Sequence, residues 1–189
     1  RRAEVLSGVL AAHPRGERRT LRTGRAQRLE IGGAVVVLAD RNELHLRRHA
    51  PLTHTLSRLG VLNSVLTAYA AQEFPLRESF DFVMADIPCS GEGRWRLCRE
   101  PDAKEESRYR RAIAEAQKKM ILRGFDLLKK EGIMLYSTCT YHPAENERAV
   151  DFLLNQRDAE VVPLGEVPGV EPGISQWRKE KFDVSAYSL

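Results

Sequence analysis

Cysteine is scarce in this sequence: its 189 residues include three, and no two of them form a Cys-x-x-Cys pair. An odd number of cysteines without such a pair argues against a disulfide framework and against a zinc site. We therefore expect free thiols and an intracellular compartment: nucleus, cytoplasm or an organelle. The histidines do not supply a metal pattern either, because His45 and His49 share a helical spacing but no third ligand follows them.

Long apolar runs are also missing. No uninterrupted segment is long enough to span a membrane, and no secretory signal is visible. A hydrophobic content of 42% with 30% charged residues is typical of one globular domain. The net charge is only +4, but residues 1–30 contain eight arginines against three glutamates. Such a basic segment can hold a polyanion such as nucleic acid, although a solvated arm has the same composition.

Apolar runs alternate with amphipathic segments, which indicates an α/β fold with a parallel sheet. Strands are expected over residues 34–39, 65–69, 80–85 and 133–136, with a further strand beginning near 161–162. Helices are expected over residues 43–59, 107–129 and 143–155. The first helix should be kinked or divided at Pro51 and should stop at Gly60.

The chain divides into three parts by composition. Residues 1–34 are basic and poorly defined, residues 35–162 form the expected core, and residues 163–189 are rich in Pro and Gly and are expected to be irregular. Val5–Leu10 could be a strand, but the Arg- and Gly-rich segment that follows it shows no clear periodicity. One domain is the economical interpretation, since no internal repeat is visible.

Two cysteines stand in matching positions after strands. Asp86, Pro88 and Cys89 directly follow the strand 80–85, and Cys139 lies on a Ser/Thr-rich turn after the strand 133–136. In open α/β sheets the carboxyl ends of the strands form the ligand-binding edge. We therefore expect the two strands to lie side by side and to bring both thiols to one pocket. Thiolates at such turns can act as nucleophiles.

Two further residues carry weaker signals. Asp40 follows the strand 34–39 and could accept hydrogen bonds from both ribose hydroxyls of a nucleoside cofactor, or could simply cap the next helix. Cys98 lies in a charged segment and is interpreted as structural. A G-x-G-x-x-G motif after a strand is missing, which counts against a dehydrogenase.

Two segments carry a family resemblance. DIPCSGEG (Asp86–Gly93) and YSTCTYHPAENE (Tyr136–Glu147) resemble the paired signatures of the Sun/Fmu-type RNA cytosine-5 methyltransferases. The resemblance extends from about Val35 to Asn155. It implies a three-layer, Rossmann-like class I methyltransferase fold, with a sheet that we expect to be incomplete at both ends. The tail Val167–Arg178 looks like the branch of eukaryotic enzymes that methylate tRNA.

The resemblance also implies roles for the site residues. Cys139 would be the nucleophile that adds to cytosine C6, and Cys89 would assist release of the methylated RNA. Asp86 would hydrogen-bond the cytosine edge, and Pro88 would shape the turn. The cofactor S-adenosylmethionine would be held by Asp40, Asp86 and Pro88. The substrate would be tRNA, with rRNA as the alternative, and the target base would be unstacked.

One region departs from the family pattern. The family holds the methionine end of its cofactor with a glycine-rich loop, and the comparable stretch Val5–Thr20 keeps only fragments of it. Bulky Arg15 stands where a small residue would let the backbone approach a ligand. Ala70 replaces the acid expected near Tyr69 for the adenine. A second hypothesis therefore stays open, namely a non-catalytic RNA-binding or assembly protein that retained the fold.

Overall fold

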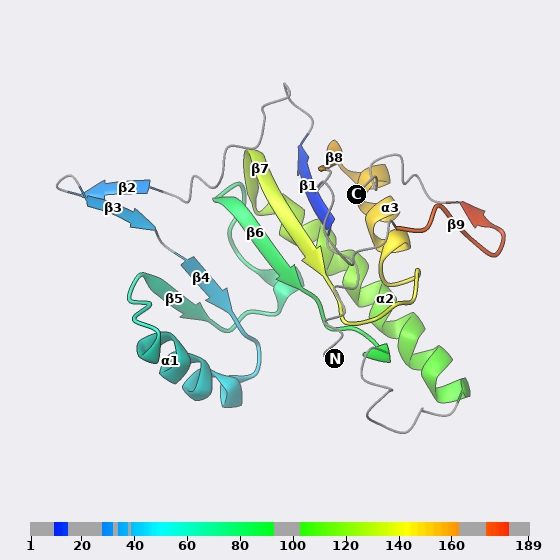
Figure 1. Ribbon diagram of the computed structural model, residues 1–189, viewed down its shortest axis with the longest axis horizontal. Coiled ribbons are helices and arrows are strands. Elements are labelled where there is room, and N and C mark those ends of the chain that lie inside the picture. Colours follow the sequence, from blue (N-terminus) through cyan, green and yellow to red (C-terminus); the bar gives the residue numbers. More distant parts are fainter. Residues whose placement is uncertain are drawn as a thin grey trace, which may run out of the picture.

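The computed structural model describes residues 10–14, 28–31, 34–37, 39–92, 103–162 and 173–181, and the structural statements below concern these residues. Their centre is a four-stranded sheet made, in spatial order, of β6 (Phe80–Asp86), β7 (Leu128–Ser137), β1 (Leu10–Pro14) and β8 (Ala159–Val162). β6 and β7 run parallel, whereas β1 runs antiparallel to β7 and to β8 (Figure 1).

Smaller two-stranded units flank this sheet. They are β2 (Arg28–Ile31) with β3 (Ala34–Val37), β4 (Ala39–Asn42) with β5 (Ser64–Thr67), and β9 (Gln176–Trp177) with β10 (Glu180–Lys181). The β4–β5 pair is parallel and the other two pairs are antiparallel. In Figure 1 the first two units lie on one side of the sheet and β9 lies on the other.

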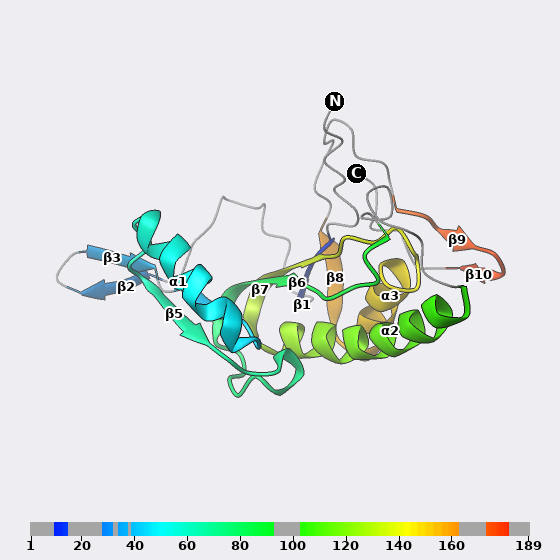
Figure 2. The same cartoon turned by 90° about the horizontal axis from the view of Figure 1, so that it is seen from below.

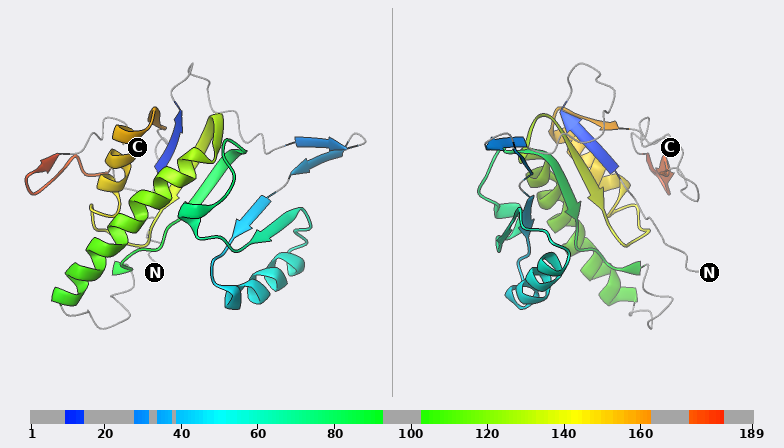
Figure 3. Two further views of the ribbon diagram at one scale, coloured as in Figure 1. Left: turned by 180° about the vertical axis from the view of Figure 1, so that it is seen from behind. Right: turned by 60° about the vertical axis from the view of Figure 1, so that its left-hand side comes forward.

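Two helices cover one face of the four-stranded sheet. They are α2 (Ala103–Asp126) and α3 (Glu147–Gln156), which lie together beneath the strands in Figure 2, and α2 crosses β7 in Figure 3. Ile121 of α2, Leu153 of α3 and Met134 of β7 are fully buried at this interface. The apolar side chains along one face of α2 thus pack against the side chains on one face of β7, and together they form the core.

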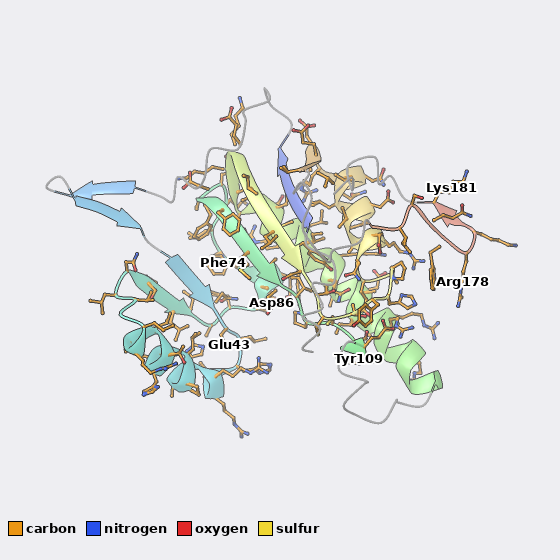
Figure 4. The ribbon with its side chains drawn as sticks, viewed as in Figure 1. Glu43, Phe74, Asp86, Tyr109, Arg178 and Lys181 are labelled. Carbon is orange, nitrogen blue, oxygen red and sulfur yellow. The ribbon has the colours of Figure 1, made fainter. Side chains whose placement is uncertain are left out.

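An aromatic contact joins the β4–β5 side of the molecule to the main sheet. Buried Phe74 packs edge-on against Tyr69, which follows β5, and against Phe80, which begins β6 (Figure 4). Phe74 directly follows the short 3-10 helix η2 (Ala71–Glu73). The Arg123 guanidinium of α2 donates to the backbone carbonyl of Phe74, so α2 holds this connection in place.

The helix predicted over residues 43–59 is divided, as expected, but not at Pro51. The short 3-10 helix η1 (Leu46–Arg48) precedes α1 (His49–Arg58), and the break lies between them. Pro51 occupies the first turn of α1, where a backbone N–H has no intrahelical acceptor to lose. Gly60, at φ +70°, follows the end of the helix as predicted.

Several predicted boundaries are wrong. The strand predicted over residues 34–39 is two strands, because β3 pairs with β2 and β4 pairs with β5. The helix predicted to reach residue 129 ends at Asp126, and Lys129 already belongs to β7. The tail predicted to be irregular contains the β9–β10 hairpin.

The position of β1 differs most from the expectation from the sequence. β1 lies in the stretch Val5–Thr20, which corresponds to the cofactor loop of the family, yet it forms a strand between β7 and β8, with Ala11 opposite both Leu135 and Val162. β1 belongs to the basic part, residues 1–34, and yet it is one of the strands of the core sheet. The rest of the comparable stretch, residues 5–9 and 15–20, lies outside the described residues. Within the described part of the chain, no helix has the length and apolar character needed to cross a membrane.

Candidate active site

The two predicted thiols meet at the carboxyl edge of the sheet. In the parallel register of β6 and β7, Asp86 lies opposite Ser137, so the turns after both strands start at the same level. The Sγ atoms of Cys89 and Cys139 are 2.9 Å apart, and the backbone N–H of Cys139 donates to Cys89 Sγ at 3.3 Å. Both thiols are free, with Cys139 exposed and Cys89 half-buried. The expectation that these strands are neighbours and bring the thiols together is confirmed.

The Cys89 thiol is held in its protonated form. Burial, together with the hydrogen bond to Cys139, raises the pKa of the Cys89 thiol to about 11. Cys89 therefore keeps its proton at neutral pH and can donate it to Cys139 Sγ. A donor in this position stabilises negative charge on the sulfur of Cys139, which is also the more exposed of the two. The geometry thus favours Cys139 as the nucleophile.

The raised pKa predicts how the reactivity of Cys89 changes with pH. In the Cys139→Ser variant, alkylation of Cys89 by iodoacetamide should still level off at a higher pH than alkylation of an ordinary exposed cysteine, because burial is the largest cause of the raised pKa and only the thiolate reacts. Peptide-resolved mass spectrometry over a pH series measures this rate. A plateau near the pKa of an ordinary exposed cysteine would contradict the assignment.

A buried carboxylate fastens the Cys89 turn. Glu145 is completely buried, and its Oε2 accepts hydrogen bonds from the Ser90 backbone N–H at 2.8 Å and from Gln117 Nε2 at 3.1 Å. Gln117 Nε2 also donates to the Pro88 carbonyl at 2.8 Å. The residues immediately before and after Cys89 are therefore held by one buried pair of side chains from α2 and from the segment that follows Cys139.

A second carboxylate ties the two turns to each other. Glu92 Oε2 accepts from Thr140 Oγ1 at 3.0 Å and from the Tyr141 N–H at 3.1 Å, and its Oε1 accepts from Arg110 Nη2 at 2.5 Å. Arg110 Nε also lies 3.7 Å from Glu145 Oε1, so one guanidinium compensates two buried or half-buried carboxylates. Networks of this kind hold reacting groups at fixed separations.

Two other predicted site residues lie at the same edge. Asp86 is the last residue of β6 and is exposed, and Figure 4 shows it at the carboxyl end of the sheet. Pro88 is exposed, with its carbonyl fixed by the bond described above. Cys98 lies outside the described residues. Among the described residues, no group of three or more His, Cys, Asp or Glu side chains is placed to hold a metal ion.

With this geometry established, similarity to known proteins identifies the family. Residues 14–183 match the family described as 16S rRNA methyltransferase RsmB/F. The chain belongs to this family. The chain is 38% identical over 141 residues to ribosomal RNA small subunit methyltransferase F of Serratia proteamaculans, a match that covers 71% of this chain and 29% of that protein. It is 32% identical over 160 residues to the human 28S rRNA (cytosine(4447)-C(5))-methyltransferase, covering 81% of this chain and 19% of that protein.

Solved structures support the same fold. A methyltransferase homologue from Pyrococcus horikoshii aligns with a TM-score of 0.59 at 28% identity, covering 73% of this chain and 42% of that protein. NSun6 from the same organism, determined with SFG, aligns with a TM-score of 0.55 at 27% identity and covers 63% and 30%. The fold is therefore the Rossmann-like methyltransferase fold with an incomplete sheet, and the chain spans less than a third of the curated relatives it matches.

The structure also draws attention to Glu43, an acidic residue that the sequence pattern did not indicate. The expectation that a strand ends at Asp40 is wrong, because Asp40 pairs with Val65 inside β4 and the strand continues to Asn42. The side chain of Asp40 lies outside the described part. Glu43 is the first residue past the carboxyl end of β4, and its backbone N–H donates to the Thr67 carbonyl at the end of β5.

The side chain of Asn42 joins the ends of β4 and β5. Its amide accepts from the Tyr69 N–H at 2.9 Å and donates to the Tyr69 carbonyl at 2.9 Å. The Glu43 carboxylate beside it accepts from the His45 N–H, and this bond lowers the pKa of Glu43. Glu43 is therefore an ionised acceptor at the carboxyl ends of β4 and β5. The hydrophobic pattern did not indicate Glu43 because the apolar run ends at Ala39, whereas the strand continues through the polar residues that follow.

Proposed function

We propose that this chain carries the catalytic thiol pair of an S-adenosylmethionine-dependent RNA cytosine-5 methyltransferase. The observation that carries the proposal is the 2.9 Å approach of Cys89 Sγ and Cys139 Sγ at the carboxyl edge of two parallel strands. Membership of the RsmB/F family and the names of the curated relatives support the reaction. The relatives' names also favour ribosomal RNA over tRNA as the substrate.

The chemistry follows from the weak nucleophilicity of cytosine C5. The Cys139 thiolate adds to C6, so that an S–C6 bond forms and C5 gains enamine character. S-adenosylmethionine supplies the methyl group that C5 takes up. A base such as water then takes the C5 proton, the C5–H electron pair forms the C5=C6 double bond, and the S–C6 bond breaks with its electron pair on the sulfur of Cys139. Cys89, which holds its proton, is placed to protonate the departing sulfur and so to favour release.

Asp86 and the ends of β4 and β6 would complete the site. Asp86 at the end of β6 would hydrogen-bond the cytosine edge and favour protonation at N3, which draws electrons from C6. An ionised carboxylate after β4 fits the ribose end of a nucleoside cofactor, since it can accept from both hydroxyls. The position of Glu43 directly after β4 supports Glu43 in this role, and Asp40 is the alternative from the sequence.

Measurements of cofactor binding can show which of the two carboxylates, Glu43 or Asp40, binds the ribose. We expect Glu43→Gln to weaken binding of S-adenosylmethionine about tenfold or more, because hydrogen bonds to a charged acceptor contribute about 1.5–3 kcal/mol. Asp40→Asn, which changes a residue within β4, should bind with nearly unchanged affinity. Isothermal titration calorimetry on both variants measures the difference. The reverse ranking would restore Asp40 as the ribose-binding acid.

The reaction itself is tested with RNA that contains 5-azacytidine. Such a ring accepts the thiolate but cannot lose a C5 proton, so an active enzyme should be trapped on the RNA as a covalent adduct that survives denaturing electrophoresis. Ribosomal RNA fragments should give more adduct than tRNA at equal concentration. A folded chain that binds RNA but gives no adduct with either would favour the non-catalytic RNA-binding hypothesis instead.

A further inference from the structure

The β9–β10 hairpin is fastened beside the Cys139 turn by two contacts. The Trp177 ring lies edge-on against the His142 ring, with centroids 6.1 Å apart and an interplanar angle of 65°. The Ile174 backbone N–H donates to Glu147 Oε1 at 3.2 Å, at the first residue of α3. His142 follows Cys139 by three residues, so the hairpin adjoins the turn that carries the proposed nucleophile.

This part of the surface displays rings and cations together. Trp177 is 39% exposed and Tyr141 is 47% exposed, although large aromatic side chains are usually buried. Arg178, Lys179 and Lys181 are exposed around Trp177. Figure 4 shows Arg178 and Lys181 extending outward from the hairpin.

The turn of the hairpin fixes how these groups are presented. Arg178 adopts φ 56° at the turn between β9 and β10, and its carbonyl accepts from Gln176 Nε2 at 3.1 Å. Burial, together with the charge of Arg110, lowers the pKa of His142, so this ring stays neutral near pH 7. His142 therefore supports Trp177 as an aromatic neighbour and adds no charge of its own.

We propose that the β9–β10 hairpin and Tyr141 form a stacking surface for the unpaired RNA nucleotides that flank the target cytosine. The proposal rests on the RNA methyltransferase function given above. Single-stranded RNA is bound by aromatic rings on which bases stack and by cations that follow the phosphates. Trp177 and Tyr141 provide the rings, and Arg178, Lys179 and Lys181 provide the positive charge beside the Cys139 turn.

The first test measures binding of a fluorescent single-stranded RNA that lacks cytosine, by anisotropy with the full chain. Trp177→Ala should weaken binding about tenfold, and Trp177→Phe should recover most of it. Lys179→Ala should lower the slope of log affinity against log salt concentration by about 0.7. Lys130→Ala is the matched control, because this exposed lysine lies near the opposite, amino end of β7 and should leave binding unchanged.

The second test separates this proposal from the proposed reaction. Adduct formation is compared on a short and a long 5-azacytidine RNA, where only the long one has flanking nucleotides. Trp177→Ala should slow adduct formation on the long RNA and leave the short RNA unaffected. Equal rates for wild type and Trp177→Ala on both RNAs, with equal RNA affinity, would overturn the stacking surface while the methyltransferase function stands. If the wild type forms no adduct at all, the function fails, and the anisotropy series still decides the hairpin.

Discussion

Replacing Cys139 with alanine is expected to abolish adduct formation and methyl transfer, whereas replacing Cys89 with alanine should make adducts accumulate on ordinary RNA. The loss in the first variant should be roughly a thousandfold or more, the scale on which enzymes lose rate when a covalent nucleophile is removed. The reason for the asymmetry is the proton held by Cys89, whose thiol has its pKa raised to about 11. Without that proton donor, the sulfur of Cys139 leaves the ring more slowly.

The measurement is denaturing electrophoresis of each variant with unmodified RNA and with 5-azacytidine RNA, in the presence of S-adenosylmethionine. Cys98→Ala is the matched control, because the sequence context of this third cysteine indicates no role in the reaction. It should behave as the wild type. Identical behaviour of the Cys89 and Cys139 variants would refute the division of roles between the two thiols.

Replacing Glu145 with alanine should lower the free energy of unfolding by about 3 kcal/mol. The variant loses the hydrogen bonds from the Ser90 N–H and from Gln117, and it leaves Arg110 with Glu92 as its remaining carboxylate partner in this network. Buried donors without acceptors are costly because they gave up water on folding. The Cys89 turn loses its anchor at the same time, so adduct formation should fall as well.

Urea unfolding of two further variants provides the comparison for the stability of Glu145→Ala. Glu145→Gln keeps an oxygen that can accept from Ser90 and Gln117 but removes the charge that faces Arg110, so its loss of stability should be intermediate. Glu115→Ala removes an exposed carboxylate paired with Lys118 and should cost at most about 0.5 kcal/mol. A Glu145→Ala variant as stable as Glu115→Ala would show that the buried network does not hold the turn.

The sequence alone determined the two strands that precede the cysteines and predicted that these strands lie side by side. The apolar runs before Asp86 and before Ser137 are strongly patterned, and turns rich in Gly, Pro, Ser and Thr follow each of them. Because parallel neighbouring strands end at one edge, the proximity of Cys89 and Cys139 followed from these local patterns together with one general rule of α/β sheets. The core face of α2 was equally legible from its helical periodicity.

The tertiary structure alone decided which backbone pairs with which. Leu10–Pro14 has little strand character of its own, yet it becomes β1 because β7 and β8 offer open hydrogen-bonding edges on either side. Asp40 and Asn42 stay in β4 because β5 pairs with them, which moves the acidic strand end to Glu43. Strand pairing and buried bonds such as those of Glu145 depend on partners distant in the chain, so hydrophobic periodicity, a local property, does not reveal them.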